Sequence, residues 1–257
     1  DYGGEVKIDW GKVESLKSDG TLKILVPGES HDALRDFLYG AQALRETREL
    51  GPESPVPLAD ITAINLEPLR LTGTVTVGGN STSGNSSTKA FNSAARLTIQ
   101  AYRQRLLLEG KYNYGQAGEL VTARNSLASV KHNYFLSKQI FIESFGMLEK
   151  DTLQNLQLRS TIGSGLGYQF YESARTTLSL SLGLAHVSEH FTNSPNTQTP
   201  SGRWSLRWEH AVWPDRVKVF HRHEGFYDVN AGNAFRINAD QGVRITVYKN
   251  LFFNVEY

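Results

Sequence analysis

Residues 156–170 run Leu156-Gln157-Leu158-Arg159-Ser160-Thr161-Ile162-Gly163-Ser164-Gly165-Leu166-Gly167-Tyr168-Gln169-Phe170. The even positions carry apolar side chains or serine, whereas the odd positions carry polar side chains or glycine. Successive side chains of a β-strand point to opposite faces, so the stretch predicts one strand with an apolar wall and a polar wall. At about fifteen residues it is much longer than the five or six residues of an ordinary soluble strand.

The same period of two extends over the chain from residue 69 onward. It is clear at residues 69–77, 106–114, 178–184, 204–208 and 237–247, and about eleven such strands are expected in all. In none of them do we expect Asp, Glu, Lys or Arg on the apolar wall. A lipid-facing wall requires this, because Arg or Lys at the lipid midplane costs roughly 2–4 kcal/mol.

The expected connections alternate between tight and long. Tight turns are predicted at residues 102–105, 136–139, 171–175, 213–216 and 248–250, and long polar loops at 78–87, 115–121, 149–155, 188–202 and 228–234. This alternation is typical of up-and-down barrels of the outer membrane. Aromatic residues mark the tight-turn rim, where an interfacial girdle belongs: Tyr102, Tyr134, Phe135, Phe170, Tyr171, Trp213 and Tyr248.

Composition excludes several other classes of protein. The formal net charge is +1 over 257 residues, which argues against a nucleic-acid partner. Cysteine is absent, so disulfides, thiolate metal sites and cysteine nucleophiles are excluded. No stretch reaches the roughly 18 apolar residues of a membrane-spanning helix. The chain opens at Asp1 without a leader-like segment, and we expect it to be mature or trimmed.

Residues 1–67 differ from the rest and predict a small β-rich region. Strands are expected at 5–10 and 21–26. Residues 8–16 align without gaps to 56–64, which indicates either two repeated units or chance alternation. Residues 32–49 are compatible with a helix or a strand. We therefore expect a periplasmic region over 1–67 and a barrel over 68–257.

Several stretches carry a family resemblance: residues 71–73 leading to 82–85, then 134–138, 158–170, 202–204 and 220–225. With them the chain resembles the salt-induced outer-membrane proteins, a Gram-negative family of unknown function. Residues 4–13 resemble the amino-terminal region often found in front of that barrel. The resemblance implies a barrel with a periplasmic amino terminus and supplies no activity. Its relatives continue through another hairpin, so we expect the barrel to be truncated before its last strand.

The predicted fold class is all-β: an antiparallel up-and-down transmembrane β-barrel of about 12 strands, of which about 11 lie in this chain. An even strand number is the rule for bacterial single-chain barrels. Charged residues of both signs are expected to line the lumen: Arg70, Arg96, Glu109, Lys111, Lys131, Glu143, Arg159, Arg207, Glu209, Lys218, Arg222, Glu224, Arg236, Asp240, Arg244 and Glu256. They predict either a salt-bridged plug or a narrow polar pore.

One histidine pair falls on the apolar wall. His221 and His223 share a face with Gly225, and Glu224 points the other way, so we expect no metal site and no cofactor. A neutral imidazole facing lipid needs hydrogen-bond partners. We therefore expect a contact surface for a second barrel or an envelope protein at His221, His223 and Gly225, unless a bulge turns the pair inward.

Two further motifs carry weaker chemistry. Ser144, Ser160 and Ser164 lie on the apolar wall, where a barrel-embedded lipase would place its nucleophile, but no motif singles one out. Gly163, Gly165 and Gly167 alternate inward and are expected to make room for large side chains rather than to bind phosphate.

The sequence therefore predicts a non-enzymatic outer-membrane barrel with outer-membrane lipid as its surroundings. We expect a narrow or occluded polar lumen and a role as an envelope or osmotic-stress component, or as an anchor for the periplasmic region. The alternatives are a small-solute porin, a soluble all-β binding protein and, last, a barrel-embedded lipase.

Overall fold

The computed structural model describes residues 22–27, 45–50, 63–64, 70–84, 87–101, 103–230, 234–248 and 251–256. The chain divides into two compact units, Asp1–Leu69 and Arg70–Tyr257. All regular structure among the described residues is β-strand. No helix in that part of the chain is long and apolar enough to cross a membrane.

The described part of the first unit is a small antiparallel sheet. β1 (Leu22–Pro27) lies between β2 (Arg45–Leu50) and β3 (Ala63–Ile64). The expected strand at 21–26 corresponds to β1, and part of the ambiguous segment 32–49 is β-strand. The expected strand at 5–10 and almost all of the proposed repeat lie outside the described residues.

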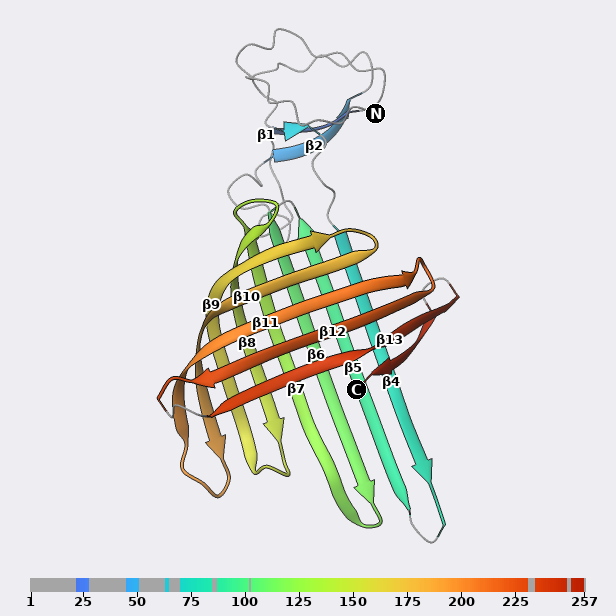
Figure 1. Cartoon of the computed structure of the whole chain (residues 1–257), viewed down its shortest axis with the longest axis vertical. Helices are drawn as coiled ribbons and strands as arrows, with labels where there is room; N and C mark the ends of the chain where they lie inside the picture. The colour runs from blue at the N-terminus through green and yellow to red at the C-terminus, as the bar shows by residue number, and fades with distance from the viewer. Residues whose placement is uncertain are drawn as a thin grey trace. The chain divides into compact units, whose positions relative to one another are not determined.

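The second unit is one antiparallel sheet of 11 strands in sequential order, curved into a nearly closed barrel (Figure 1). Its strands are β4 (Arg70–Thr82), β5 (Thr88–Ala101), β6 (Gln104–Ala117), β7 (Leu120–Phe135), β8 (Ile140–Asp151), β9 (Leu156–Glu172), β10 (Thr176–Phe191), β11 (Thr197–Trp213), β12 (Val217–Asp228), β13 (Phe235–Tyr248) and β14 (Leu251–Glu256). Among the described residues β4 pairs only with β5, and β14 only with β13. The predicted up-and-down barrel is confirmed.

Most of the large exposed apolar side chains lie on the outside of the barrel, whereas charged and polar side chains share the interior with several phenylalanine rings. Leu184, on the predicted apolar wall, is 71% exposed, and Ile162 is 63% exposed. By contrast Arg203 and Glu143 are buried, as is Thr161, the inward neighbour of Ile162. This distribution is the reverse of a water-soluble barrel, whose interior is apolar.

The expected role of the inward glycines holds at two of the three positions. Gly167 lies directly opposite Phe141, and a Cβ added at Gly167 would come within 2.1 Å of that ring. Gly163 lies opposite Phe145 in the same way, with a contact of 2.6 Å. Gly165 instead allows close approach of β10, since its added Cβ would meet a backbone oxygen at 2.2 Å. The first two glycines thus hold phenylalanine rings inside the barrel.

The expected alternation of long and tight connections is wrong in part. Residues 118 and 119 alone connect β6 to β7, where a loop over 115–121 was expected. Gly118 has a φ of 61°, a conformation that suits glycine and closes a short hairpin turn. Residues 192–196 connect β10 to β11, because the polar residues on either side extend the strands.

Two details of the walls also differ from expectation. Phe135 belongs to the interior, where its ring lies 5.2 Å from that of Phe141, rather than to the aromatic girdle. The outward wall is not free of charge: Lys89, Arg124 and Lys150 point outward near the end of the barrel opposite the tight turns. Only Lys150 lay in a predicted loop, whereas Lys89 and Arg124 lay beyond the predicted loops 78–87 and 115–121, so the expectation of an uncharged apolar wall is wrong at these positions.

Candidate functional site

Arg203 is the centre of the polar interior. It extends inward from β11 with its side chain 0% exposed, and it pairs with Glu143 of β8 and Glu224 of β12. Glu224 also accepts a bond from Lys131 of β7 at 3.1 Å. Ser181 of β10 donates to Glu143 at 2.9 Å. Apart from the pair Arg203–Glu224 on the neighbouring strands β11 and β12, these contacts join strands that are not neighbours in the sheet, so side chains bridge the barrel interior.

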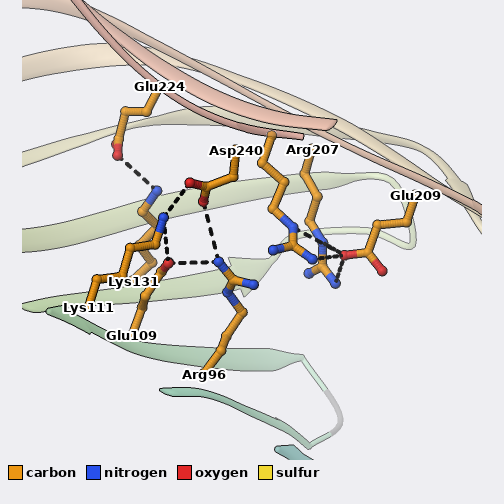
Figure 2. A network of polar contacts seen from close by, with 9 residues as sticks. Arg96, Glu109, Lys111, Lys131, Arg207, Glu209, Glu224 and Asp240 are labelled. Atoms are coloured by element: carbon orange, nitrogen blue, oxygen red, sulfur yellow. Dashed lines mark hydrogen bonds and ion pairs between the residues drawn. The ribbon is translucent and has the colours of Figure 1, made fainter. Parts of the chain in front are cut away.

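A second group of ion pairs lies beside the first (Figure 2). Arg96 of β5 donates to Glu109 of β6 at 2.7 Å and lies 3.5 Å from Asp240 of β13. Lys111 of β6 pairs with the same Asp240 and lies 3.4 Å from Glu109. β5 and β6 are thereby tied to β13 across the interior.

Glu209 organises a third group, also visible in Figure 2. Arg207 lies 3.1 Å from one Glu209 oxygen, and Arg222 lies 2.8 Å from the same oxygen. Two guanidinium groups therefore share one carboxylate, which gives this part of the interior an excess of positive charge.

Aromatic rings fill the space between the ion pairs. The Arg203 guanidinium lies 3.9 Å from the centre of the Phe145 ring, and Arg236 lies 4.6 Å from that of Phe226. Such cation–π contacts stabilise a cation that has left water. The space that remains around the central ion pairs is a cavity of about 130 Å³. Arginine–phenylalanine stacks and ion pairs are thus found together in the interior.

Most of the predicted lumen residues point inward and are buried or half-buried: Arg96, Glu109, Lys111, Lys131, Glu143, Arg159, Arg207, Glu209, Arg222, Glu224, Arg236, Asp240 and Arg244. Arg70 and Lys218 are exposed and line a polar vestibule of about 460 Å³ at the tight-turn end. The side chain of Glu256 lies outside the described residues.

Several interior residues are not among those predicted to line the lumen. Arg105 was assigned to a turn, yet β6 begins one residue before it, and Arg105 is buried with Glu172 at 2.7 Å. Arg203 was on the polar wall by parity but was left out of the lumen set. Glu189, which binds Arg159 at 2.6 Å, lay in a predicted loop. Strict extension of the period of two would have found all three.

The histidine pair lies on the outward wall without a bulge. The register of β12 with β13 is continuous through His221 and His223. The two imidazoles hydrogen-bond each other at 2.9 Å. Trp204 covers Gly225, where an added Cβ would come within 2.0 Å of the indole. The pair therefore stays on the outward wall, as parity predicts, and each ring has the other as a partner.

Two of the three predicted outward serines, Ser144 and Ser164, lie near His132, whereas Ser160 pairs with Leu148 and Ser188 away from it. Ser144 of β8 faces His132 of β7 on one side and Ser164 of β9 on the other. These residues line an open groove on the outward wall, and His132 is hydrogen-bonded to Gln104 at 2.9 Å. Within the described ranges no three His, Asp or Glu side chains are grouped so as to hold a metal ion.

An up-and-down antiparallel barrel with an apolar exterior and a charged interior defines the structural class of this protein. Within that class, the chain belongs to the family DUF481, described as a protein of unknown function, whose model matches residues 75–257. No curated protein and no solved structure matches the chain.

Proposed function

We propose that this protein is an integral outer-membrane β-barrel of a Gram-negative bacterium. The observation that carries the proposal is the exposure of apolar side chains along the outward wall, as at Leu182, Leu184 and Val247. Such a wall facing water would be a large aggregation-prone surface, whereas in lipid it is stabilised. The likeness to the salt-induced outer-membrane proteins supports the same location.

Membrane extraction and gel mobility test the location. The full chain should leave the membrane fraction only with detergent, and unboiled samples should migrate differently from boiled ones. Recovery of a folded monomer in buffer without detergent would contradict the proposal and favour the soluble binding protein.

We further propose that the lumen is occluded and that the barrel conducts little or no solute. The pairs Arg203–Glu143 and Lys111–Asp240 support this, because each spans the interior between strands distant in the sheet. Several of these charges would have to be removed together before a solute could pass through the lumen. The barrel then acts as an envelope or osmotic-stress component, or as an anchor for residues 1–67 in the periplasm. If the barrel conducts ions across a lipid bilayer, the alternative function of a small-solute porin is favoured.

A second candidate function is hydrolysis of a lipid ester in the outward groove. His132 Nε2 lies 2.9 Å from the Gln104 carbonyl oxygen, and in the tautomer that donates to this oxygen the other ring nitrogen is the base; Ser144 lies directly opposite on the next strand. In that reaction the Ser144 hydroxyl would attack the acyl carbonyl while His132 takes its proton, and the ester bond would break as His132 returns that proton to the departing alcohol. Water would then attack the acyl-serine, releasing the fatty acid and restoring the Ser144 hydroxyl. Fatty-acid release from phospholipid by the purified protein, abolished by Ser144→Ala but not by Ser160→Ala, is the expected result. No release by the unmodified protein would exclude this function.

A further inference from the structure

Three cations break the otherwise uncharged outward wall of the described strands. Lys89, Arg124 and Lys150 each lie an odd number of residues from an inward-facing charge on the same strand and point the other way. All three are exposed, and all three are basic. They lie on β5, β7 and β8, which occupy one sector of the sheet.

The height of the three residues is the same on each strand. Each lies about ten to twelve residues from the tight-turn end of its strand, and a tilted strand needs about 9–11 residues to cross a membrane. The outward wall is thus free of charge over one crossing length. The first charges of this wall lie at the height where the hydrocarbon core would end and the lipid headgroups would begin.

The register places the cations near one another. Lys150 faces Ser126 on β7, two residues from Arg124, so the two side chains are diagonal neighbours at roughly 7–8 Å. Arg124 faces Tyr114 on β6, and Lys89 faces Gln116 on the same strand.

The three cations have no carboxylate partner among the described residues. Glu149 and Glu189 of this rim are engaged by Arg159 inside the barrel. Glu119, in the turn after β6, offsets one positive charge at most. The sector therefore keeps a net positive charge that nothing described in the chain neutralises.

We propose that Lys89, Arg124 and Lys150 bind the phosphate groups of a phosphorylated glycolipid of the lipid A type in the outer leaflet. The inference rests on the proposed membrane location. Ammonium and guanidinium groups at headgroup height recognise anionic lipids by charge, and a guanidinium can hold a phosphate with two hydrogen bonds. The uncharged wall below them would contact the acyl chains of the same lipid.

Lipid binding by the full chain in zwitterionic detergent micelles tests the proposal. Labelled lipid A should be retained by the wild type, and Lys89→Gln/Arg124→Gln/Lys150→Gln should bind it about tenfold more weakly, the loss expected from three surface ion pairs. The matched control Lys138→Gln/Arg175→Gln/Arg216→Gln removes the same charge from the tight turns and should bind like the wild type. The wild type should bind dephosphorylated lipid A as weakly as the variant Lys89→Gln/Arg124→Gln/Lys150→Gln binds lipid A.

Three results would overturn the inference. The two triple variants could bind lipid A equally well, or the wild type could bind dephosphorylated lipid A as well as lipid A. Low millimolar inorganic phosphate could also displace lipid A from the wild type. The last result would assign the cations to free phosphate. The gel mobility of unboiled samples separates failure of the lipid site from failure of the proposed membrane location. A heat-modifiable barrel whose lipid binding ignores the three cations refutes the lipid site alone, whereas a protein folded without detergent refutes the membrane location.

Discussion

Arg203→Ala removes the cation at the centre of the polar interior. The change leaves Glu143 with only the Ser181 hydroxyl, whereas Glu224 retains Lys131. An unpaired buried carboxylate costs about 3–5 kcal/mol, and the stack on Phe145 is lost as well. We therefore expect the free energy of unfolding to fall by about 3–5 kcal/mol. Urea unfolding in lipid vesicles, followed by tryptophan fluorescence, measures it.

Arg207→Ala is the matched control, because Arg207 lies on the same strand and the same wall. Its side chain is 29% exposed, and its partner Glu209 keeps Arg222. The expected loss is at most about 1 kcal/mol. Glu143→Gln in the Arg203→Ala background should recover part of the stability, since the orphaned charge is gone. Equal losses in the two single variants, or no recovery, would show that the buried ion pairs do not hold the barrel together.

Gly167→Ala forces a methyl group against the Phe141 ring and should cost about 1–3 kcal/mol in the same unfolding assay, with recovery in the Phe141→Leu background; an unchanged free energy would refute the packing. Protease added to intact cells should cut within residues 192–196 and spare the tight turns, and cleavage only at the tight turns would invert the proposed topology. His221→Leu with His223→Leu should leave the barrel heat-modifiable but weaken any complex recovered in mild detergent. An undiminished complex, or a complex absent from the wild type, would remove the proposed contact surface.

The wall pattern was predictable from sequence because the period of two is a local property. From Leu158 to Gln169, each side chain has the direction that parity assigns it, and the same holds for His221 and His223 on β12. Leu156, predicted on the apolar outer wall, is buried instead, because irregularities in the register on both sides pair it with Asp151 and Phe191. Strand ends were less predictable. The turn at Gly118 depends on one residue with positive φ. Beyond the apolar wall, polar residues extend the strands, so no apolar alternation marks where a strand ends.

The partners inside the barrel could not be predicted in the same way. Parity places Glu143 and Arg203 on the inner wall but says nothing of how β8 and β11 face each other. That relation depends on barrel curvature, which the close approach of Gly165 to β10 helps to set. The sequence therefore predicted the members of the interior network but not its connections.

Single-channel recording in a planar lipid bilayer tests the occluded lumen most directly. Insertion is checked separately by the unboiled gel mobility of protein recovered from the same vesicles. An occluded lumen predicts no regular conductance steps for the wild type, since the pairs Arg203–Glu143 and Lys111–Asp240 bridge the lumen. It predicts steps when both bridges are removed by Arg203→Ala with Lys111→Ala. Stable ohmic steps of porin size from the unmodified chain would contradict the occluded barrel.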